Sequence, residues 1–279
     1  MDAIVIDIGN TNVALGLFLK DTLDHVERLP VGGLAQLTER IRILRQRCGA
    51  QPLGARTVPV VVSSVNPPVL AQVERAVNDA LDQQARLIGR DVPVGIKYAV
   101  ENPERVGTDR LLCAAAAYDV VGDAVVVADL GSATTVDVVS HQGIFLGGAI
   151  LPGLRLGALS LHEHTAQLPM VEPAVPKGDY PTNTVAAIEH GLYYGAIGAL
   201  RALVERFATL LGRWPQVVMT GGYARMLAAE ADFVDNCVPD LVLSGIFLAW
   251  KKYLSEQQEQ AAREMGELED VLGGEDEQD

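Results

Sequence analysis

The chain has 279 residues, 49% of them hydrophobic, and a formal net charge of −14. This length suits about two domains, and so much apolar sequence excludes intrinsic disorder for most of the chain. A strongly acidic chain also lacks the basic surface that a nucleic-acid backbone requires, so we expect no nucleic acid as a partner.

The cysteines and the N-terminal residues predict a cytoplasmic protein. Residues 255–279 hold ten acidic residues and a single basic one, so the remainder of the chain is only mildly acidic. Three widely separated cysteines without a CxxC spacing fit a reducing compartment better than a disulfide framework. The N-terminal residues lack the basic segment of a secretory signal, and no apolar run reaches ~18 residues, so we expect neither export nor a membrane partner.

The first half of the chain predicts a hairpin followed by a strand and a helix. An apolar run at 3–6 ends in the sequence Asp-Ile-Gly-Asn-Thr-Asn at 7–12, and a second apolar run follows at 13–18. This order is typical of a strand, a tight turn and a second strand. A valine-rich strand at 58–62 then leads through two serines into a predicted helix over 67–81.

The second half repeats this order about 120 residues later. A valine-rich run at 124–128 ends in Asp-Leu-Gly-Ser-Ala-Thr-Thr at 129–135, and a further strand follows at 136–139. A later strand at 216–219 passes through Thr-Gly-Gly into a predicted helix that ends near 229. Repetition on this scale indicates an α/β fold of two similar domains with a cleft between them. The alternative is coincidence, because Asp-x-Gly turns are common.

Three further helices complete the prediction. One covers 107–118, between the two halves, and the last covers 240–254, before an acidic tail that we expect to be disordered. The helix over 183–211 carries three glycines at near-helical spacing, which are Gly191, Gly195 and Gly198. Small residues on one face favour close packing with another helix or a dimer interface, and simple tolerance of glycine is the alternative.

The two Asp-x-Gly turns are candidate phosphate-binding loops. The sequence contains neither a Gly-Lys dipeptide nor a Gly-x-Gly spacing, which excludes a Walker A loop and the dinucleotide fingerprint. Glycine lets a turn approach a ligand closely, and the N–H groups of such a turn can surround an anion. Because neither turn contains Lys or Arg, the carboxylates of Asp7 and Asp129 would act through a cation such as Mg²⁺. A purely structural role for both aspartates, as turn formers, is the alternative.

A second candidate site is the sequence Gly-Thr-Asp-Arg at 107–110, at the start of a predicted helix. The N–H groups and the dipole of a helix N-terminus favour an anion. Asp109 can accept a proton from an attacking hydroxyl, and Arg110 can fork onto a carboxylate or a phosphate. Ordinary helix-start chemistry, with Thr108 as the N-cap, also explains these residues.

Together with further motifs, these segments resemble the type III pantothenate kinases, members of the acetate kinase, sugar kinase, heat-shock-70 and actin superfamily. The further motifs are Asn102-Pro103, Gly-Gly-Ala-Ile-Leu-Pro-Gly at 147–153, Leu168-Pro169, Asn183-Thr184 and Pro-Asp-Leu-Val-Leu at 239–243. The resemblance covers roughly residues 3–250. It implies duplicated actin-like (ribonuclease H-like) domains at 1–117 and 118–254 with a cleft between them, and the tail at 255–279 lies outside it.

The resemblance implies transfer of the γ-phosphoryl group of ATP to the 4′-hydroxyl of pantothenate, the first step of coenzyme A biosynthesis. It assigns ATP binding to Asp7, Ile8, Gly9, Asn10, Thr11, Asn12, Val13, Ala14 and Ser132. It assigns pantothenate binding to Gly107, Thr108, Asp109, Arg110 and Thr184, with Asp109 as the catalytic proton acceptor. Mg²⁺ accompanies ATP and contacts Asp7 through water, whereas Asp129 holds a monovalent cation, K⁺ or NH₄⁺. The family completes this pocket across a homodimer.

Two positions depart from the family pattern. Ser132 stands where the family usually has Thr, which preserves the hydroxyl. Val100 stands where the family often has Tyr, and Tyr98 shares a face of an extended strand with it, so both are candidate pantothenate contacts. Other functions that the same segments allow are a different small-molecule kinase of the superfamily, a transcription-accessory protein and an actin-like filament.

Overall fold

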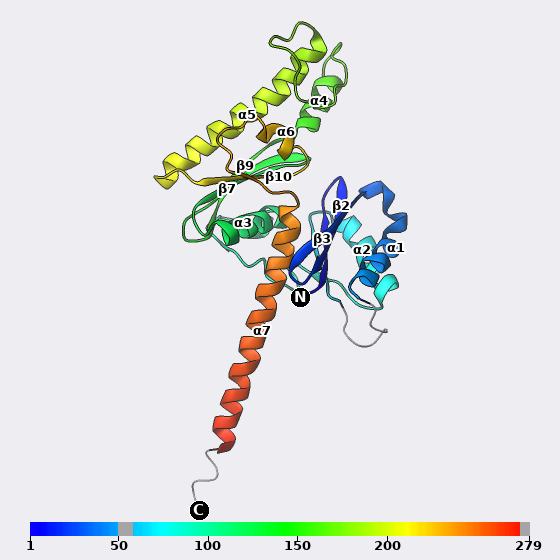
Figure 1. Cartoon of the computed structure of the whole chain (residues 1–279), viewed down its shortest axis with the longest axis vertical. Helices are drawn as coiled ribbons and strands as arrows, with labels where there is room; N and C mark the ends of the chain where they lie inside the picture. The colour runs from blue at the N-terminus through cyan, green and yellow to red at the C-terminus, as the bar shows by residue number, and fades with distance from the viewer. Residues whose placement is uncertain (50–57, 274–279) are drawn as a thin grey trace, which may run out of the picture.

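The computed structural model describes residues 1–49 and 58–273, with side chains as far as residue 265, and it contains two mixed sheets (Figure 1). The first sheet has the strand order β3-β2-β1-β4-β5. These strands are β1 (Ala3–Ile8), β2 (Asn12–Leu19), β3 (Thr22–Pro30), β4 (Val60–Ser64) and β5 (Arg86–Leu87). The predicted hairpin is therefore confirmed, and β4 lies parallel to its first strand.

The second sheet has the order β11-β10-β7-β8-β9-β6. Its strands are β6 (Lys97–Tyr98), β7 (Val125–Leu130), β8 (Ala133–Val139), β9 (Ile144–Pro152), β10 (Gln216–Thr220) and β11 (Asn236–Cys237). Apart from the added edge strand β6, each pairing has a counterpart of the same direction in the first sheet. The predicted duplication is confirmed in strand order and in strand direction.

The two copies also agree in register. Asp7 in β1 is paired with Ala14 on one side and Ser63 on the other. Asp129 in β7 is paired with Thr135 on one side and Thr220 on the other. Each aspartate is the penultimate residue of the central strand of its sheet, so the fold places the two carboxylates at equivalent positions.

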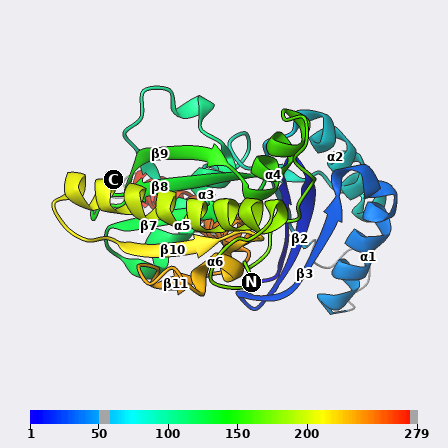
Figure 2. The same ribbon diagram turned by 90° about the horizontal axis from the view of Figure 1, so that it is seen from above.

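Helices cover both faces of each sheet. One face of the first sheet packs on α1 (Leu37–Arg47) and α2 (Pro67–Leu81). The short η1 (Val31–Gln36) directly precedes α1. One face of the second packs on α4 (Leu154–Glu163), α5 (Thr184–Leu211) and α6 (Ala224–Ala228). Figure 2 shows α5 lying across the second sheet and α1 and α2 beside the first.

The remaining two helices pack between the sheets. They are α3 (Thr108–Val121), which follows the short η2 (Pro103–Arg105), and α7 (Leu241–Gly273). Helix α7 packs on the first sheet, α3 packs on the second, and the two helices contact each other (Figure 1). A Cβ on Gly245 would lie 2.3 Å from the carbonyl oxygen of Leu112, so glycine permits this close helix contact.

Composition explains why the central elements form where they do. The alternate residues Ile4, Ile6 and Ile8 of β1 face α1 and α2, whereas Ala3 and Val5 face α7. A strand that is covered on both faces is apolar throughout, which is the pattern of the sequence at 3–6. None of the described helices is both long enough and apolar enough to cross a bilayer.

Two predicted boundaries lie within helices. The domain division at 117/118 falls inside α3, and α7, from the second predicted domain, packs on the first sheet. The final helix continues to Gly273, so residues 255–273 of the predicted tail are helical in the structure. The rest of the predicted tail, residues 274–279, lies outside the described residues.

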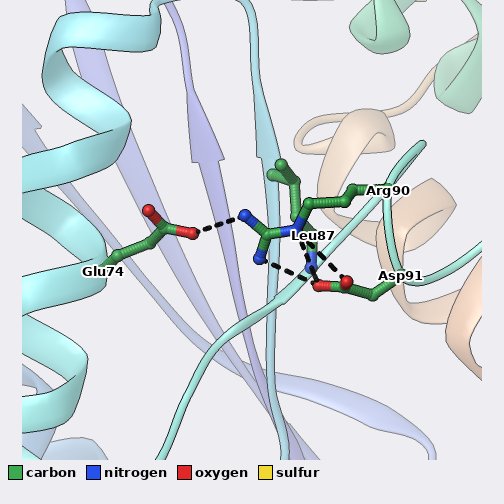
Figure 3. Close-up of polar contacts among 4 residues, drawn as sticks. All are labelled: Glu74, Leu87, Arg90 and Asp91. Carbon is green, nitrogen blue, oxygen red and sulfur yellow. Dashed lines mark hydrogen bonds and ion pairs between the residues drawn. The ribbon is translucent and has the colours of Figure 1, made fainter.

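A loop after β5 is fixed against α2 by charged side chains (Figure 3). Arg90 forms ion pairs of 3.0 Å with Glu74 and with Asp91, and Asp91 accepts a hydrogen bond of 2.8 Å from the N–H of Leu87. Exposed pairs of this kind are each worth ~0–1 kcal/mol, so their main effect is to fix geometry. The loop turns at Gly89, which has a φ of +86°. A Cβ on Gly89 would lie 4.0 Å from the methyl group of Thr108, at the start of α3.

Candidate active site

The two Asp-x-Gly turns, which are 122 residues apart in the sequence, meet in the structure. The hydroxyl oxygens of Thr11 and Ser132 lie 2.5 Å apart, within hydrogen-bond distance. Each turn is closed by a backbone hydrogen bond, of 3.0 Å from Gly9 to Asn12 and of 3.1 Å from Gly131 to Ala133. A ligand at this contact would be reached by N–H groups and hydroxyls from both halves of the molecule.

Carboxylates from both halves lie beside these turns. Burial, together with the negative charges of Asp109 and Asp129, raises the pKa of Asp7 to about 7, although a hydrogen bond with Ser63 opposes the shift. Burial also raises the pKa of Asp129 to about 6, helped by the charges of Asp109 and Asp137. The site therefore concentrates negative charge that a cation would stabilise.

The sequence Gly-Thr-Asp-Arg begins α3 at the same place. The hydroxyl of Thr108 lies 3.2 Å from that of Ser63, the residue paired with Asp7. The Asp109 carboxylate folds back over Gly107: a Cβ on Gly107 would lie 2.3 Å from Oδ1 of Asp109. Gly107, not Thr108, is the N-cap, and it forms no side-chain cap. The prediction of Thr108 as an ordinary N-cap is therefore wrong, and its side chain faces the site instead.

Arg110 makes a buried ion pair with Asp137 of β8. Its Nε donates to both carboxylate oxygens of Asp137 at 3.1 Å, and its Nη2 donates to one of them. The Asp137 side chain is 3% exposed and that of Arg110 is 15% exposed. Burial raises the pKa of Asp137, and the adjacent guanidinium opposes that shift. The guanidinium also lies over the ring of Phe145, 5.8 Å from its centroid.

The donor set fits a cation that arrives with a ligand. Among the residues that the structure describes, no three His, Cys, Asp or Glu side chains are grouped to hold a metal ion by themselves. Burial and the negative charges around them nevertheless destabilise the ionised forms of Asp7 and Asp129, which a cation would stabilise. Mg²⁺ usually keeps several waters and bridges one or two carboxylates to phosphate oxygens, and this arrangement suits that mode.

Comparison with known proteins identifies the family. The family model for type III pantothenate kinase matches residues 3–206. Type III pantothenate kinases from Dehalococcoides mccartyi and Brevibacillus brevis are each 34% identical to this chain; each comparison covers 89% of it, and 96% and 98% of the respective relative. The chain belongs to the type III pantothenate kinase family.

The fold also matches a solved structure with a different description. A conserved putative Baf family transcriptional activator from Campylobacter jejuni has a TM-score of 0.57 and 21% identity, and the match covers 92% of this chain and 99% of that one. At this identity the match shows the fold alone. It agrees with the duplicated actin-like α/β architecture that the family implies.

The structure brings together most residues that family membership points to. Asp7, Thr11, Ser132, Thr108 and Asp109 lie around the meeting point of the two turns. The side chains of Ile8, Val13 and Ala14 are buried in the core, so only their backbone groups could contact a ligand. Gly9 is half-buried, and Asn10 and Asn12 are exposed beside Thr11.

Three predicted pantothenate contacts lie differently. Thr184 is exposed at the first turn of α5, next to the N-cap Asn183. Tyr98 is 49% exposed on β6, whereas Val100 is half-buried and packs near Gly147. The predicted equivalence of Tyr98 and Val100 therefore has no support in their surroundings. Tyr98 does pair with Phe145, the residue beneath Arg110.

Sequence reasoning missed Ser63, Asp137 and Gly221. Asp137 is the only charged residue in β8, and a lone charge in an apolar strand was the available signal. Gly221 has a φ of +92°, and a Cβ there would lie 2.4 Å from Oδ1 of Asp129, so this glycine lies directly on the carboxylate. Ser63 carried no signal beyond its place at the end of a strand.

Proposed function

We propose that the meeting point of the two turns and the start of α3 form the active site of a pantothenate kinase. The reaction transfers the γ-phosphoryl group of ATP to the 4′-hydroxyl of pantothenate, the first step of coenzyme A biosynthesis. The observation that carries this proposal is the contact of Thr11 with Ser132, which joins the two turns beside Asp7, Asp109 and Asp129.

The turns bind the phosphates of ATP. The backbone N–H groups within residues 8–14 that the hairpin leaves unpaired, and the hydroxyls of Thr11 and Ser132, act as neutral donors to phosphate oxygens. Mg²⁺ bound to ATP supplies the positive charge that the turns lack, and Asp7 contacts it through water. Asp129 holds the monovalent cation, K⁺ or NH₄⁺. Family membership and the shared negative charge of the two aspartates support these assignments.

Pantothenate binds at the start of α3. Asp109 accepts the proton of the attacking hydroxyl, and Gly107, Thr108 and Arg110 hold the substrate. In phosphoryl transfer the protein mainly positions the reactants and neutralises charge, so this base needs no unusual basicity. The position of Asp109 supports this role: it lies in the first turn of α3 next to Thr108, whose hydroxyl is 3.2 Å from that of Ser63, the residue paired with Asp7.

The protein is a homodimer, with Thr184 and the exposed face of α5 at or near the interface. A Cβ on Gly191, Gly195 or Gly198 would meet no atom within 4 Å, so that glycine face of α5 is open in the protomer. Large apolar side chains on α5 and on α4, which packs against it, are exposed, namely Val185, Tyr194, Leu156 and Leu159. Exposed apolar side chains beside an open helix face are typical of an interaction site. Sedimentation velocity tests this: Gly195→Arg should shift the dimer toward monomer.

The three cysteines are free thiols, Cys113 buried and Cys48 and Cys237 partly so, which suits the reducing cytoplasm that we propose as the compartment.

Release of ADP in the presence of pantothenate and Mg²⁺ tests the function. We expect turnover that depends on pantothenate, falls strongly when K⁺ is replaced by Na⁺, and stops in EDTA. A panel of other hydroxyl compounds, including sugars, serves as the control. Turnover with a sugar but not with pantothenate would contradict the proposal, as would full activity in EDTA.

A further inference from the structure

We propose that Asp137 is a positioning residue that holds one edge of the Arg110 guanidinium, so that its other edge receives the carboxylate of pantothenate. The inference rests on the proposed function, because it takes pantothenate as the substrate and Arg110 as one of its contacts. It adds a residue that the sequence motifs did not indicate and assigns Arg110 to one end of the substrate.

The hydrogen bonds of the pair leave part of the guanidinium available. Nε and Nη2 of Arg110 both donate to Asp137. Among the described residues none accepts a hydrogen bond from Nη1. A guanidinium held along its Nε edge still presents two N–H groups at its outer end, which match the two oxygens of a carboxylate. The side chain of Arg110 remains 15% exposed, whereas Asp137 is 3% exposed, so the accessible part of the pair is the arginine.

The equivalent position in the other half shows that packing does not require this pair. By register, Asp137 in β8 corresponds to Gly16 in β2, since Val5 pairs with Gly16 and Val127 with Asp137. A Cβ on Gly16 would meet Leu243, the third residue of α7, whereas Asp137 meets Arg110, the third residue of α3. The same strand–helix contact is thus apolar in the first half and ionic in the second.

The strand beside Asp137 has no side chain against the ion pair. Gly148 in β9 pairs with Asp137, and a Cβ there would lie 2.2 Å from the carbonyl oxygen of Val136 and 2.4 Å from Oδ1 of Asp137. The corresponding residue of the first sheet is Val26, which pairs with Gly16. Removing two charges from water is unfavourable, and apolar pairs of similar volume often stabilise a fold as well or better. A gain in stability therefore does not explain the pair, and a role in the site does.

The chemistry of pantothenate supplies that role. Its only charge is a carboxylate, at the opposite end from the hydroxyl that is phosphorylated. Neighbouring residues on a helix point in different directions, so Asp109 and Arg110 can serve the two ends of one molecule. The Arg110 guanidinium lies over the ring of Phe145 in β9. Phe145 pairs with Tyr98, which is itself a predicted pantothenate contact, so the carboxylate end of the substrate would lie near β9.

Steady-state kinetics of Asp137→Asn with two substrates test the inference. The substrates are pantothenate and pantothenol, the alcohol that lacks the carboxylate. We expect kcat/KM for pantothenate to fall at least about tenfold, through KM, because the arginine loses its charged partner. For pantothenol the change should be less than about twofold, because no carboxylate is bound. A merely structural role of Asp137 would affect both substrates equally.

The matched control is Asp232→Asn, which removes the exposed Arg201–Asp232 pair, where the guanidinium also lies over a ring, that of Phe233. Asp232→Asn should leave kcat/KM unchanged for both substrates. If Asp137→Asn does not fold, as judged by circular dichroism, Arg110→Lys keeps the charge but loses the fork and should show the same selective loss. Equal losses with both substrates, or none, would overturn the inference while leaving the kinase function intact. No turnover of pantothenate by the unaltered protein would instead contradict the proposed function.

Discussion

The two hairpins present the same carboxylate at the same position, but in different surroundings. The turn after Asp7 is open: its residues Asn10, Thr11 and Asn12 are exposed, and a Cβ on Gly9 would meet only one backbone oxygen, at 3.2 Å. The turn after Asp129 is exposed as well, at Ser132 and Ala133, and a Cβ on Gly131, the equivalent of Gly9, would meet no atom closer than 3.5 Å. The difference lies at the carboxylate itself: backbone encloses Asp129, because a Cβ on Gly221 would lie 2.4 Å from its Oδ1.

This difference indicates how a duplicated scaffold acquires two roles. Strand order and register place both aspartates, and the neighbouring chain then determines what each can bind. Two exposed turns can close on a large ligand such as a triphosphate. A carboxylate with the backbone of Gly221 against it, as at Asp129, suits a small fixed ion. The same contrast separates the apolar contact of α7 with β2 from the ionic contact of α3 with β8.

The largest expected effect lies outside both hairpins. If the hairpin aspartates serve cations and α3 supplies the base, Asp109→Asn should lower kcat by ~10²-fold or more. Nucleotide binding, measured by calorimetry, and the melting temperature should change little, because Asn has the same size. Near-normal turnover would mean that Asp109 only shapes the start of the helix.

Asp7→Asn and Asp129→Asn separate the two hairpins chemically. Asp129→Asn should raise the K⁺ concentration for half-maximal activity by about tenfold or more, because an anionic ligand is lost. Asp7→Asn should instead raise the Mg²⁺ requirement. Titration of each cation at a saturating level of the other measures both effects. Identical cation profiles for the two variants would remove the proposed difference between the hairpins.

Glycine substitutions test the difference in cover. Gly221→Ala combines a positive φ with a clash against Asp129, so it should lower the free energy of unfolding by ~1–3 kcal/mol. Gly9→Ala has a normal φ and a single contact at 3.2 Å, so its cost should be smaller. Urea unfolding followed by circular dichroism compares them. Equal losses for the two variants would mean that the backbone at Gly221 does not enclose Asp129.

The smallest effect concerns pH. The pKa values of Asp7 and Asp129 are raised in the folded protein, to about 7 and about 6, above the ordinary value of 3.8. The folded state therefore binds more protons than the unfolded state between about pH 4 and pH 7, and this contribution to stability falls as pH rises through that window.

Melting temperatures without added cation should accordingly fall across this range, relative to the double variant Asp7→Asn, Asp129→Asn. Mg²⁺ and K⁺ should raise the melting temperature more at pH 8 than at pH 5, where protons compete with them. Cation stabilisation that does not change with pH would show that these carboxylates do not face the ions.

Particular residues show what the sequence could and could not predict. The two turns were predictable because Asp-x-Gly after an apolar strand is a local signal, and its repetition implied the duplication. Pairings between distant segments were not, because Asp137 and Arg110 are 27 residues apart and meet only through the register of the second sheet.

The acidic tail shows how little composition alone says about local structure. Its composition favours disorder, yet the helix that begins at Leu241 in the core continues through residues 255–273. Propagation of an existing helix costs far less than starting a new one, so a helix anchored by packing can extend into sequence that has no core of its own. Composition alone does not carry that information.

A crystal structure with a non-hydrolysable ATP analogue, Mg²⁺ and K⁺ tests the central claim most directly. The account predicts that the β- and γ-phosphates lie between residues 8–14 and Ser132, with density for the monovalent cation at Asp129. Phosphates bound by one turn alone, or a nucleotide bound away from both turns, would contradict it.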